Sequence, residues 1–149
     1  MAINNKEIVR RLYKEMWNER KEHVAHELLS DSHALSDPIL TGSSVGPEAY
    51  LGQVRQLVGA FPDLRFHIDE LLCEKEKVVV SWVASGTHKG SIFGCDPTNR
   101  KISIAGITIH HLANGKILDS HAVWDTYCLF KEVGGLPAIR AEAHTVGKR

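Results

Sequence analysis

The 149-residue sequence has no excess charge of either sign and no long apolar run. Lys and Arg together number 18, and so do Asp and Glu, so net charge gives no attraction to nucleic acid or to a membrane surface. No apolar stretch approaches the roughly 20 residues of a membrane-spanning helix. Charged residues interrupt the first eleven residues, MAINNKEIVRR, where a signal peptide would carry its apolar segment. We therefore expect a cytoplasmic protein that binds neither nucleic acid nor membrane.

Cysteine is also scarce, and its pattern gives no sign of a disulfide or zinc framework. Cys73, Cys95 and Cys128 are odd in number and far apart, without a C-x-x-C pair, which favours reduced thiols. The adjacent histidines His110 and His111 would leave a strand on opposite faces, so they cannot both bind one metal ion. We expect no metal site.

Three stretches in the first half of the chain show apolar residues at helical spacing, and they cover residues 5–17, 21–29 and 47–61. Pro47 stands where the first turn of a helix accepts proline, and Pro62 ends the third stretch. Between the second and third helices, Pro38 biases the residue before it toward extended backbone, which predicts a short strand over residues 33–38.

After the third helix the apolar residues alternate with polar ones, as in strands. The alternation begins with Leu64, Phe66 and Ile68, and residues 78–88 are the most β-prone run. Residues 101–129 read as two strands joined at Ala113-Asn114-Gly115, because Asn-Gly between apolar runs is a strong hairpin signal.

Helices early and strands late predict an α+β fold. We expect a curved antiparallel sheet with the three helices of the N-terminal half packed on one side, as one domain over residues 1–149. Such a cone-shaped α+β barrel narrows to side chains at depth and encloses a natural pocket for a small molecule.

The hairpin turn predicts which side chains share a face. With Asn114-Gly115 as a two-residue turn, one face holds four opposed pairs: Thr108 with His121, Gly106 with Val123, Ile104 with Asp125, and His110 with Asp119. This mixture of polar, small and apolar side chains is typical of a pocket wall. A bulge would shift the register by one residue.

Asp125 has two interpretations. Beside Trp124, Val123 and Ile104, a desolvated carboxyl group could act as a general acid and base toward a carbonyl compound. Alternatively, Asp125 caps the turn that begins at Tyr127 and is only structural. The residues alone favour the cap.

Several segments together resemble the SnoaL-like polyketide cyclases of the nuclear-transport-factor-2-like superfamily. They are GTHKGSIFGCDPTNR (86–100), GITIHHLANGKI (106–117), VWDTYCLFKEVG (123–134) and the Phe61-Pro62-Asp63-Leu64 phrase. The resemblance covers nearly the whole chain. It implies a cone of helices against a curved sheet, commonly as a dimer, and an intramolecular aldol ring closure that needs no cofactor.

The resemblance also implies a general acid/base at Asp125, in the last strand. A histidine that assists in some of these cyclases corresponds here to Thr108, and a position that is often aromatic is His121. His121, opposite Thr108 in the expected register, could replace the missing histidine. Because the superfamily also contains isomerases, dehydratases, hydrolases and non-catalytic binders, an isomerase, a hydrolase or a hydrophobic-ligand-binding protein remains the alternative.

The remaining candidates would bind the substrate, which we expect to be a small apolar or aromatic carbonyl compound. They are aromatic residues of the first helix and the central strand, polar residues of the short strand, and hairpin residues: Tyr13, Trp17, Trp82, His33, Asp37, Ile104, Thr108 and Val123. Each aromatic could equally be simple core, and Asp37 before Pro38 could serve only the turn. We expect a homodimer that pairs through the sheet.

Overall fold

The computed structural model describes residues 4–39 and 44–134. The described chain begins with a continuous helical segment whose second half is wound as a π-helix: α1 spans Asn5–Arg11 and η1 spans Leu12–Asn18. The Asn4 side chain caps α1 by accepting a hydrogen bond from the Glu7 N–H. In η1 the Glu19 N–H donates to the Lys14 carbonyl, five residues back, at 3.0 Å. The predicted helix is confirmed, and its π-helical half is an addition.

The end of η1 is tied to the sheet. The Asn18 amide accepts a hydrogen bond from the Phe66 N–H at 2.7 Å and donates one to the Phe66 carbonyl at 2.9 Å, as a neighbouring strand would. Arg20, in the left-handed region at φ 61°, donates to the backbone carbonyl of Leu64 at 2.8 Å. Both contacts fix the helical segment against the start of the next strand.

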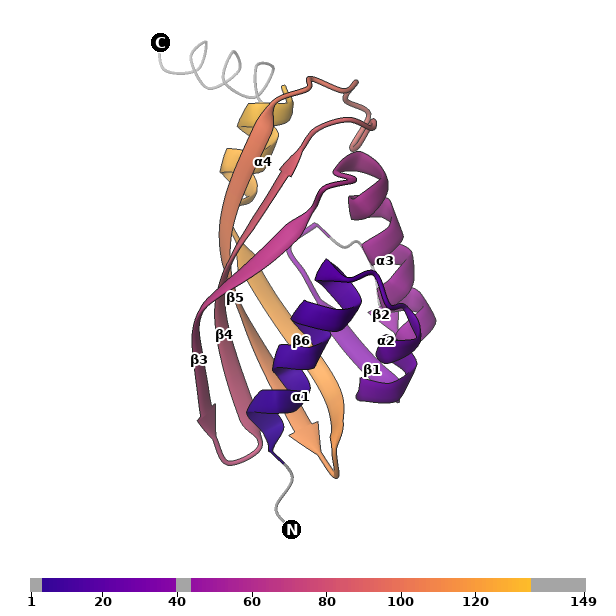
Figure 1. Cartoon of the computed structure of the whole chain (residues 1–149), viewed down its shortest axis with the longest axis vertical. Helices are drawn as coiled ribbons and strands as arrows, with labels where there is room; N and C mark the ends of the chain where they lie inside the picture. The colour runs from indigo at the N-terminus through magenta and orange to yellow at the C-terminus, as the bar shows by residue number, and fades with distance from the viewer. Residues whose placement is uncertain (1–3, 40–43, 135–149) are drawn as a thin grey trace, which may run out of the picture.

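The next elements are two helices with two strands between them. They are α2 (His23–Leu28), β1 (Leu29–Ser36), β2 (Ser44–Val45) and α3 (Pro47–Ala60). Pro47 lies in the first turn of α3 and the helix stops before Pro62, as predicted. Figure 1 shows α1, α2 and α3 on the same side of the sheet.

Four longer strands follow: β3 (Arg65–Glu74), β4 (Lys77–Thr87), β5 (Lys101–Ala113) and β6 (Lys116–Trp124). Within the described residues the sheet has six strands in the order β2-β1-β6-β5-β4-β3. The neighbouring pairs are antiparallel, except that β1 runs parallel to β6. The expected α+β fold with a curved sheet is confirmed, and the sheet contains one parallel pair in addition (Figure 1).

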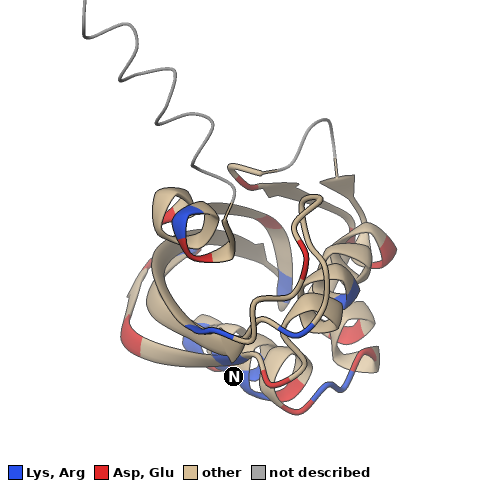
Figure 2. Ribbon diagram, turned by 90° about the horizontal axis from the view of Figure 1, so that it is seen from above, with Lys and Arg blue, Asp and Glu red and all other residues tan. Residues whose placement is uncertain are grey.

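A fourth helix, α4 (Thr126–Val133), closes the described chain. Asp125 is its N-cap and Gly134, at φ 93°, is its C-cap. Viewed from above, the sheet curves around one side while helices stand on the other, and charged residues of both signs are spread along the chain (Figure 2). No helix within the described residues is long and apolar enough to cross a membrane.

The β5–β6 hairpin differs from the expected register. Asn114 and Gly115 both have positive φ, 51° and 80°, as the Asn-Gly turn requires, and Ala113 pairs with Lys116. A bulge then leaves Leu118 unpaired, because Leu112 pairs with Ile117 and His111 with Asp119.

Every later pair on β6 is shifted by one residue. Ala122 lies opposite Thr108, and Trp124 lies opposite Gly106. The inward-facing position predicted for His121, Val123 and Asp125 is therefore wrong, because the period-two alternation turns a one-residue shift into a change of face. Ser120, Ala122 and Trp124 line the inner face instead.

The core lies between the inner face of the sheet and the helices. Burial along β5 alternates strictly from Lys101 to His110, which confirms the predicted two-residue period. Fully buried side chains come from both layers: Val9, Leu12 and Met16 from the first helical segment, Leu51 from α3, and Val78, Leu112 and Ile117 from the strands.

Candidate functional site

A cavity of about 110 Å³ lies between the helices and the inner face of the sheet. Its walls come from η1, β1, α3, the four long strands and α4, so nearly every element contributes. The lining is mainly apolar, and it is rich in aromatic rings: Tyr13, Trp17, Tyr50, Phe61, Phe66, Trp82 and Trp124. Apolar walls with a few polar groups are typical of small-molecule sites.

The aromatic walls hold one another in place. The Phe66 ring centroid lies 4.7 Å from that of Trp17, 5.0 Å from that of Trp82 and 5.5 Å from that of Tyr13. The Trp17 indole N–H also donates to the Tyr50 hydroxyl at 2.8 Å, which joins η1 to α3. Because tilted pairs of this kind are favourable, the walls are largely pre-formed.

Gly106 makes room for the Trp82 indole. Gly106 is the β5 partner of Trp82 and also faces Trp124 on β6. A Cβ atom at Gly106 would lie 2.4 Å from the Trp82 ring and 2.7 Å from the Trp124 Cβ. With glycine at this position the indole lies directly over the strand, and its N–H donates to the Thr108 hydroxyl at 2.9 Å.

At one part of the cavity wall, four buried polar side chains form a continuous hydrogen-bonded row. The Tyr13 hydroxyl lies 3.0 Å from His110 Nε2, and His110 Nδ1 lies 2.6 Å from the Ser120 hydroxyl. The same hydroxyl lies 2.9 Å from His33 Nε2. His33 Nδ1 is buried and has no hydrogen-bond partner in the described structure.

Burial keeps the row uncharged near neutral pH. Desolvation, together with the nearby His33 and His111, lowers the pKa of His110 to about 3. Desolvation also lowers the pKa of His33 to about 4, although Asp119 acts in the opposite direction. The pKa of the Tyr13 phenol is raised by burial, so all three rings are neutral groups that can donate hydrogen bonds.

One carboxylate, Asp37, is found among the lining residues that the structure describes. It follows β1 and is half-buried. The Trp124 indole N–H donates to it, with both carboxylate oxygens at 3.1 Å, and the Ile39 N–H donates to Oδ1 at 3.1 Å. Parallel pairing of β1 with β6 brings these distant residues together. Asp37 is thus an oriented acceptor in a mainly apolar cavity.

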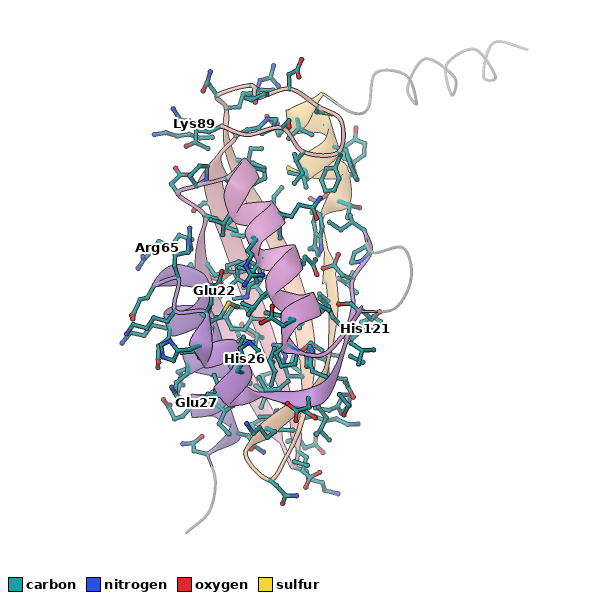
Figure 3. All side chains as sticks on the ribbon, turned by 90° about the vertical axis from the view of Figure 1, so that its right-hand side faces the viewer. Glu22, His26, Glu27, Arg65, Lys89 and His121 are labelled. Carbon is teal, nitrogen blue, oxygen red and sulfur yellow. The ribbon has the colours of Figure 1, made fainter. Side chains whose placement is uncertain are left out.

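The structure brings together six of the predicted site residues in the cavity wall: Tyr13, Trp17, Asp37, Trp82, Ile104 and Thr108. His33 lies behind the wall and touches Ser120. Val123 is 58% exposed on the outer face of the sheet. His121 is exposed as well, and Figure 3 shows it at the outer margin of the fold.

Asp125 is exposed and does not line the cavity. Its Oδ1 accepts a hydrogen bond from the Cys128 N–H at 2.9 Å, which confirms the capping interpretation. The catalytic roles inferred for Asp125 and His121 stay predictions.

Sequence reasoning missed Ser120, Tyr50 and Gln53. Ser120 reaches the inner face only because of the bulge at Leu118. Tyr50 belongs to the predicted apolar stripe of α3, where nothing in the pattern separates a lining residue from a core residue. Gln53 lines the cavity with its Oε1 atom buried and without a partner. His110 lines the cavity on the same face of β5 as Thr108, as the alternation of the strand predicts.

Among the described residues, no group of three or more His, Cys, Asp or Glu side chains is arranged to hold a metal ion. The three cysteines are free thiols that form no disulfide.

Comparison with known proteins agrees with the family resemblance found in the sequence. The family model described as SnoaL-like polyketide cyclase matches residues 7–133. A comparison with curated proteins finds no match.

Solved structures share the fold. A candidate SnoaL-like polyketide cyclase from Jannaschia sp. CCS1 superimposes with a TM-score of 0.81 at 21% identity, covering 89% of this chain and 92% of that one. A candidate polyketide cyclase from Acidithiobacillus ferrooxidans gives 0.78 at 25% identity, covering 89% and 97%. AclR, a candidate hydroxylase from Streptomyces galilaeus, gives 0.78 at 20% identity, also covering 89% and 97%.

Proposed function

Because the chain belongs to the SnoaL-like polyketide cyclase family, we propose that it catalyses cofactor-independent acid–base chemistry on a small apolar or aromatic carbonyl compound. The proposed reaction is intramolecular aldol cyclisation. A base removes a proton next to one carbonyl group, the enolate carbon attacks a second carbonyl carbon, and the new alkoxide takes a proton back. The atoms balance without an added reagent, since one carboxyl group can remove the proton and later return it.

One observation carries this proposal: among the described residues, a single carboxylate is held in the wall of an aromatic cavity. Asp37 keeps both oxygens near the Trp124 N–H, and its neighbours in the cavity are apolar rings. A ligand that fills the cavity displaces water from around the carboxylate, which strengthens electrostatic interactions with the reacting atoms. We assign the role of general acid and base to Asp37.

Asp125 remains the alternative for that role, because the family resemblance places the general acid/base there, with His121 as its possible assistant. A ligand in the cavity described above would not meet either exposed side chain. The two assignments therefore predict opposite results when each aspartate is replaced.

The test compares Asp37→Asn with Asp125→Asn on a panel of β-keto esters and aryl diketones, with product formation followed by mass spectrometry. Asparagine retains an acceptor oxygen at both sites, so it preserves the Trp124 contact in one variant and the helix cap in the other. We expect Asp37→Asn to lower kcat at least about 100-fold, the lower limit for loss of a general acid/base, and Asp125→Asn to retain activity. The opposite result would move the role to Asp125, and normal rates in both variants would exclude this mechanism.

The same walls suit two other functions. An isomerase or hydrolase of this fold would use the same carboxylate on a different carbonyl compound, and the panel would reveal it by its product. A non-catalytic binder would retain a hydrophobic ligand without turnover. Wild type and Asp37→Asn would then bind the ligand with the same affinity, and neither would form product.

We also propose that the protein forms a homodimer through the outer face of the sheet. Large apolar side chains are exposed there on adjacent strands: Ile107 is 50% exposed and its partner Val123 is 58% exposed, with Ile109 nearby at 37%. Neighbouring exposed apolar side chains of this kind are typical of interaction surfaces. Sedimentation equilibrium should show a dimer that Ile107→Lys dissociates, and a monomeric wild-type protein would refute the proposal.

A further inference from the structure

Three members of the row of buried polar side chains line the cavity, and the hydrogen bonds along the row determine which proton is left for a ligand. We infer that Tyr13 donates its hydroxyl proton to a carbonyl or enolate oxygen of the ligand, and that His110, Ser120 and His33 fix the direction of that hydroxyl. The inference deepens the proposed function and rests on it, because it assumes a carbonyl ligand in the cavity.

The four groups are removed from bulk water. Tyr13 is 4% exposed, His110 1%, Ser120 2% and His33 0%. The three contacts between them measure 3.0, 2.6 and 2.9 Å, all within hydrogen-bond range. Burial holds both imidazoles in the neutral form near neutral pH, so neither ring carries a second proton.

Counting protons leaves three arrangements. Each of the four neutral groups has one proton to donate, whereas the row contains three hydrogen bonds, so one proton remains unused. If Ser120 accepts from both imidazoles, the unused proton is its own, and the described structure gives this buried hydroxyl no acceptor, which is unfavourable. The other two arrangements leave the proton at one end of the row. In the first of these Tyr13 donates to His110, and the remaining proton is on His33 Nδ1. In the second arrangement every bond is reversed, His110 donates to the phenol oxygen, and the remaining proton is the Tyr13 hydroxyl proton.

The far end of the row decides between them when a carbonyl ligand is bound. His33 Nδ1 is buried without a partner, so the first arrangement leaves an N–H group unsatisfied, a rare and unfavourable condition in folded proteins. In the first arrangement the phenol oxygen also has no proton left for the ligand, so two acceptor oxygens face each other. The second arrangement places the free proton at the cavity, where the ligand oxygen accepts it.

The row therefore selects acceptor oxygens at this part of the cavity. His110 and Ser120 also line the cavity, but in this arrangement their protons are used inside the row, so the proton that the row offers to a ligand is that of the Tyr13 hydroxyl. His110, Ser120 and His33 therefore act as positioning residues. The chemical class that they favour is a ketone, or the enolate formed from it, on an aromatic skeleton that the rings around Phe66 can contact.

The test uses a matched pair of ligands, 2-acetylnaphthalene and 2-ethylnaphthalene, which share an apolar skeleton but differ in the carbonyl group. Calorimetry on the full chain gives the dissociation constant of each, and their ratio isolates the carbonyl contact from general changes in the cavity. We expect Tyr13→Phe to weaken binding of the ketone about two- to tenfold, the range for one neutral hydrogen bond, and to leave the hydrocarbon unchanged.

Ser120 tests the row itself. Ser120→Ala removes the hydroxyl that donates to His110 Nδ1, which weakens the preference of His110 for donating to the phenol oxygen, so the ketone-to-hydrocarbon ratio should move toward that of Tyr13→Phe. Ser120→Thr keeps the hydroxyl and should restore the wild-type ratio. The infrared carbonyl stretch of the bound ketone should rise in Tyr13→Phe and Ser120→Ala, a change that a purely structural role would not produce.

An equal ratio in wild type and Tyr13→Phe would overturn the inference, and an unchanged ratio in Ser120→Ala would overturn the part played by the row. If wild type bound neither ligand, the proposed cavity function would fail and the inference with it. If both ligands bound as expected but no β-keto ester were turned over, the proposed reaction would fail while the inference stood.

Discussion

Acidification from pH 7 to pH 5 should destabilise this fold through two buried histidines, His33 and His110. In the folded protein burial lowers their pKa values to about 4 and about 3, from 6.5 in an exposed chain. Between pH 6.5 and those lower values, the unfolded chain binds protons that the folded chain does not. Stability therefore falls as the pH falls through this window.

The size of the effect at pH 5 follows from the unfolded chain. Each pKa unit is worth 1.36 kcal/mol, and pH 5 lies about 1.5 units below 6.5, so keeping one histidine neutral costs about 2 kcal/mol. This figure does not depend on the folded pKa as long as that value lies below 5. The two histidines together should remove roughly 4 kcal/mol, a large part of the 5–15 kcal/mol that a domain of this size normally has.

Carboxylates contribute little in this range. The Thr87 N–H lowers the pKa of Asp63, so the stability that Asp63 contributes is present above its ordinary pKa of 3.8 and is lost only as the pH falls below that value. A loss between pH 7 and pH 5 therefore reports mainly on histidine.

Urea unfolding followed by circular dichroism at pH 7, 6 and 5 measures the effect. His110→Gln removes one titrating group while its amide can still pair with Tyr13 and Ser120, so we expect this variant to lose about 2 kcal/mol over the range rather than roughly 4. The exposed His121→Asn is the matched control and should behave as wild type. Equal wild-type stability at pH 7 and pH 5 would refute the reasoning.

Two further predictions concern the backbone. Gly106→Ala should destabilise the protein by about 1–3 kcal/mol in urea unfolding, because its Cβ would collide with the Trp82 ring, whereas Gly52→Ala in α3 meets nothing within 4 Å and should not destabilise. Similar losses in both variants would argue against the collision. Asp125→Ala should lower thermal stability by about 1 kcal/mol through loss of the Cys128 N–H contact, and Asp125→Ser should restore most of it. An alanine variant as stable as wild type would contradict the capping role.

The parts of the fold that depend on local patterns were predictable. The apolar stripe of α3 with its flanking prolines, and the Asn114-Gly115 turn, each follow from neighbouring residues, and the structure confirms both. The bulge was not predictable in position, because Ile117 and Leu118 are both apolar and either could be the paired residue. That single residue decides whether Ser120 or His121 meets the cavity.

Contacts between distant segments account for the rest. Asp37 meets Trp124 only because β1 lies parallel to β6, and no local pattern reports such a pairing. The row from His33 to Tyr13 likewise depends on four separate elements, β1, β6, β5 and η1. The resemblance to a family predicted the fold correctly. The acid–base role that it implies for Asp125 stays a prediction, and the structure shows the Asp125 side chain capping α4.

The π-helical half of the first helix also determines how many residues fit between the two ends of this segment. The segment is fastened at both ends, by the Asn4 cap and by the pair of hydrogen bonds between Asn18 and Phe66. Between these anchors η1 is wound as a π-helix, and its Tyr13 and Trp17 side chains line the cavity. Deleting one residue, such as the exposed Lys14, would let the segment relax to an ordinary α-helix and rotate one anchor away from its partner. Substitution at Lys14 changes only the surface of the protein. The number of residues in η1 therefore matters more to the cavity than the identity of its exposed side chains.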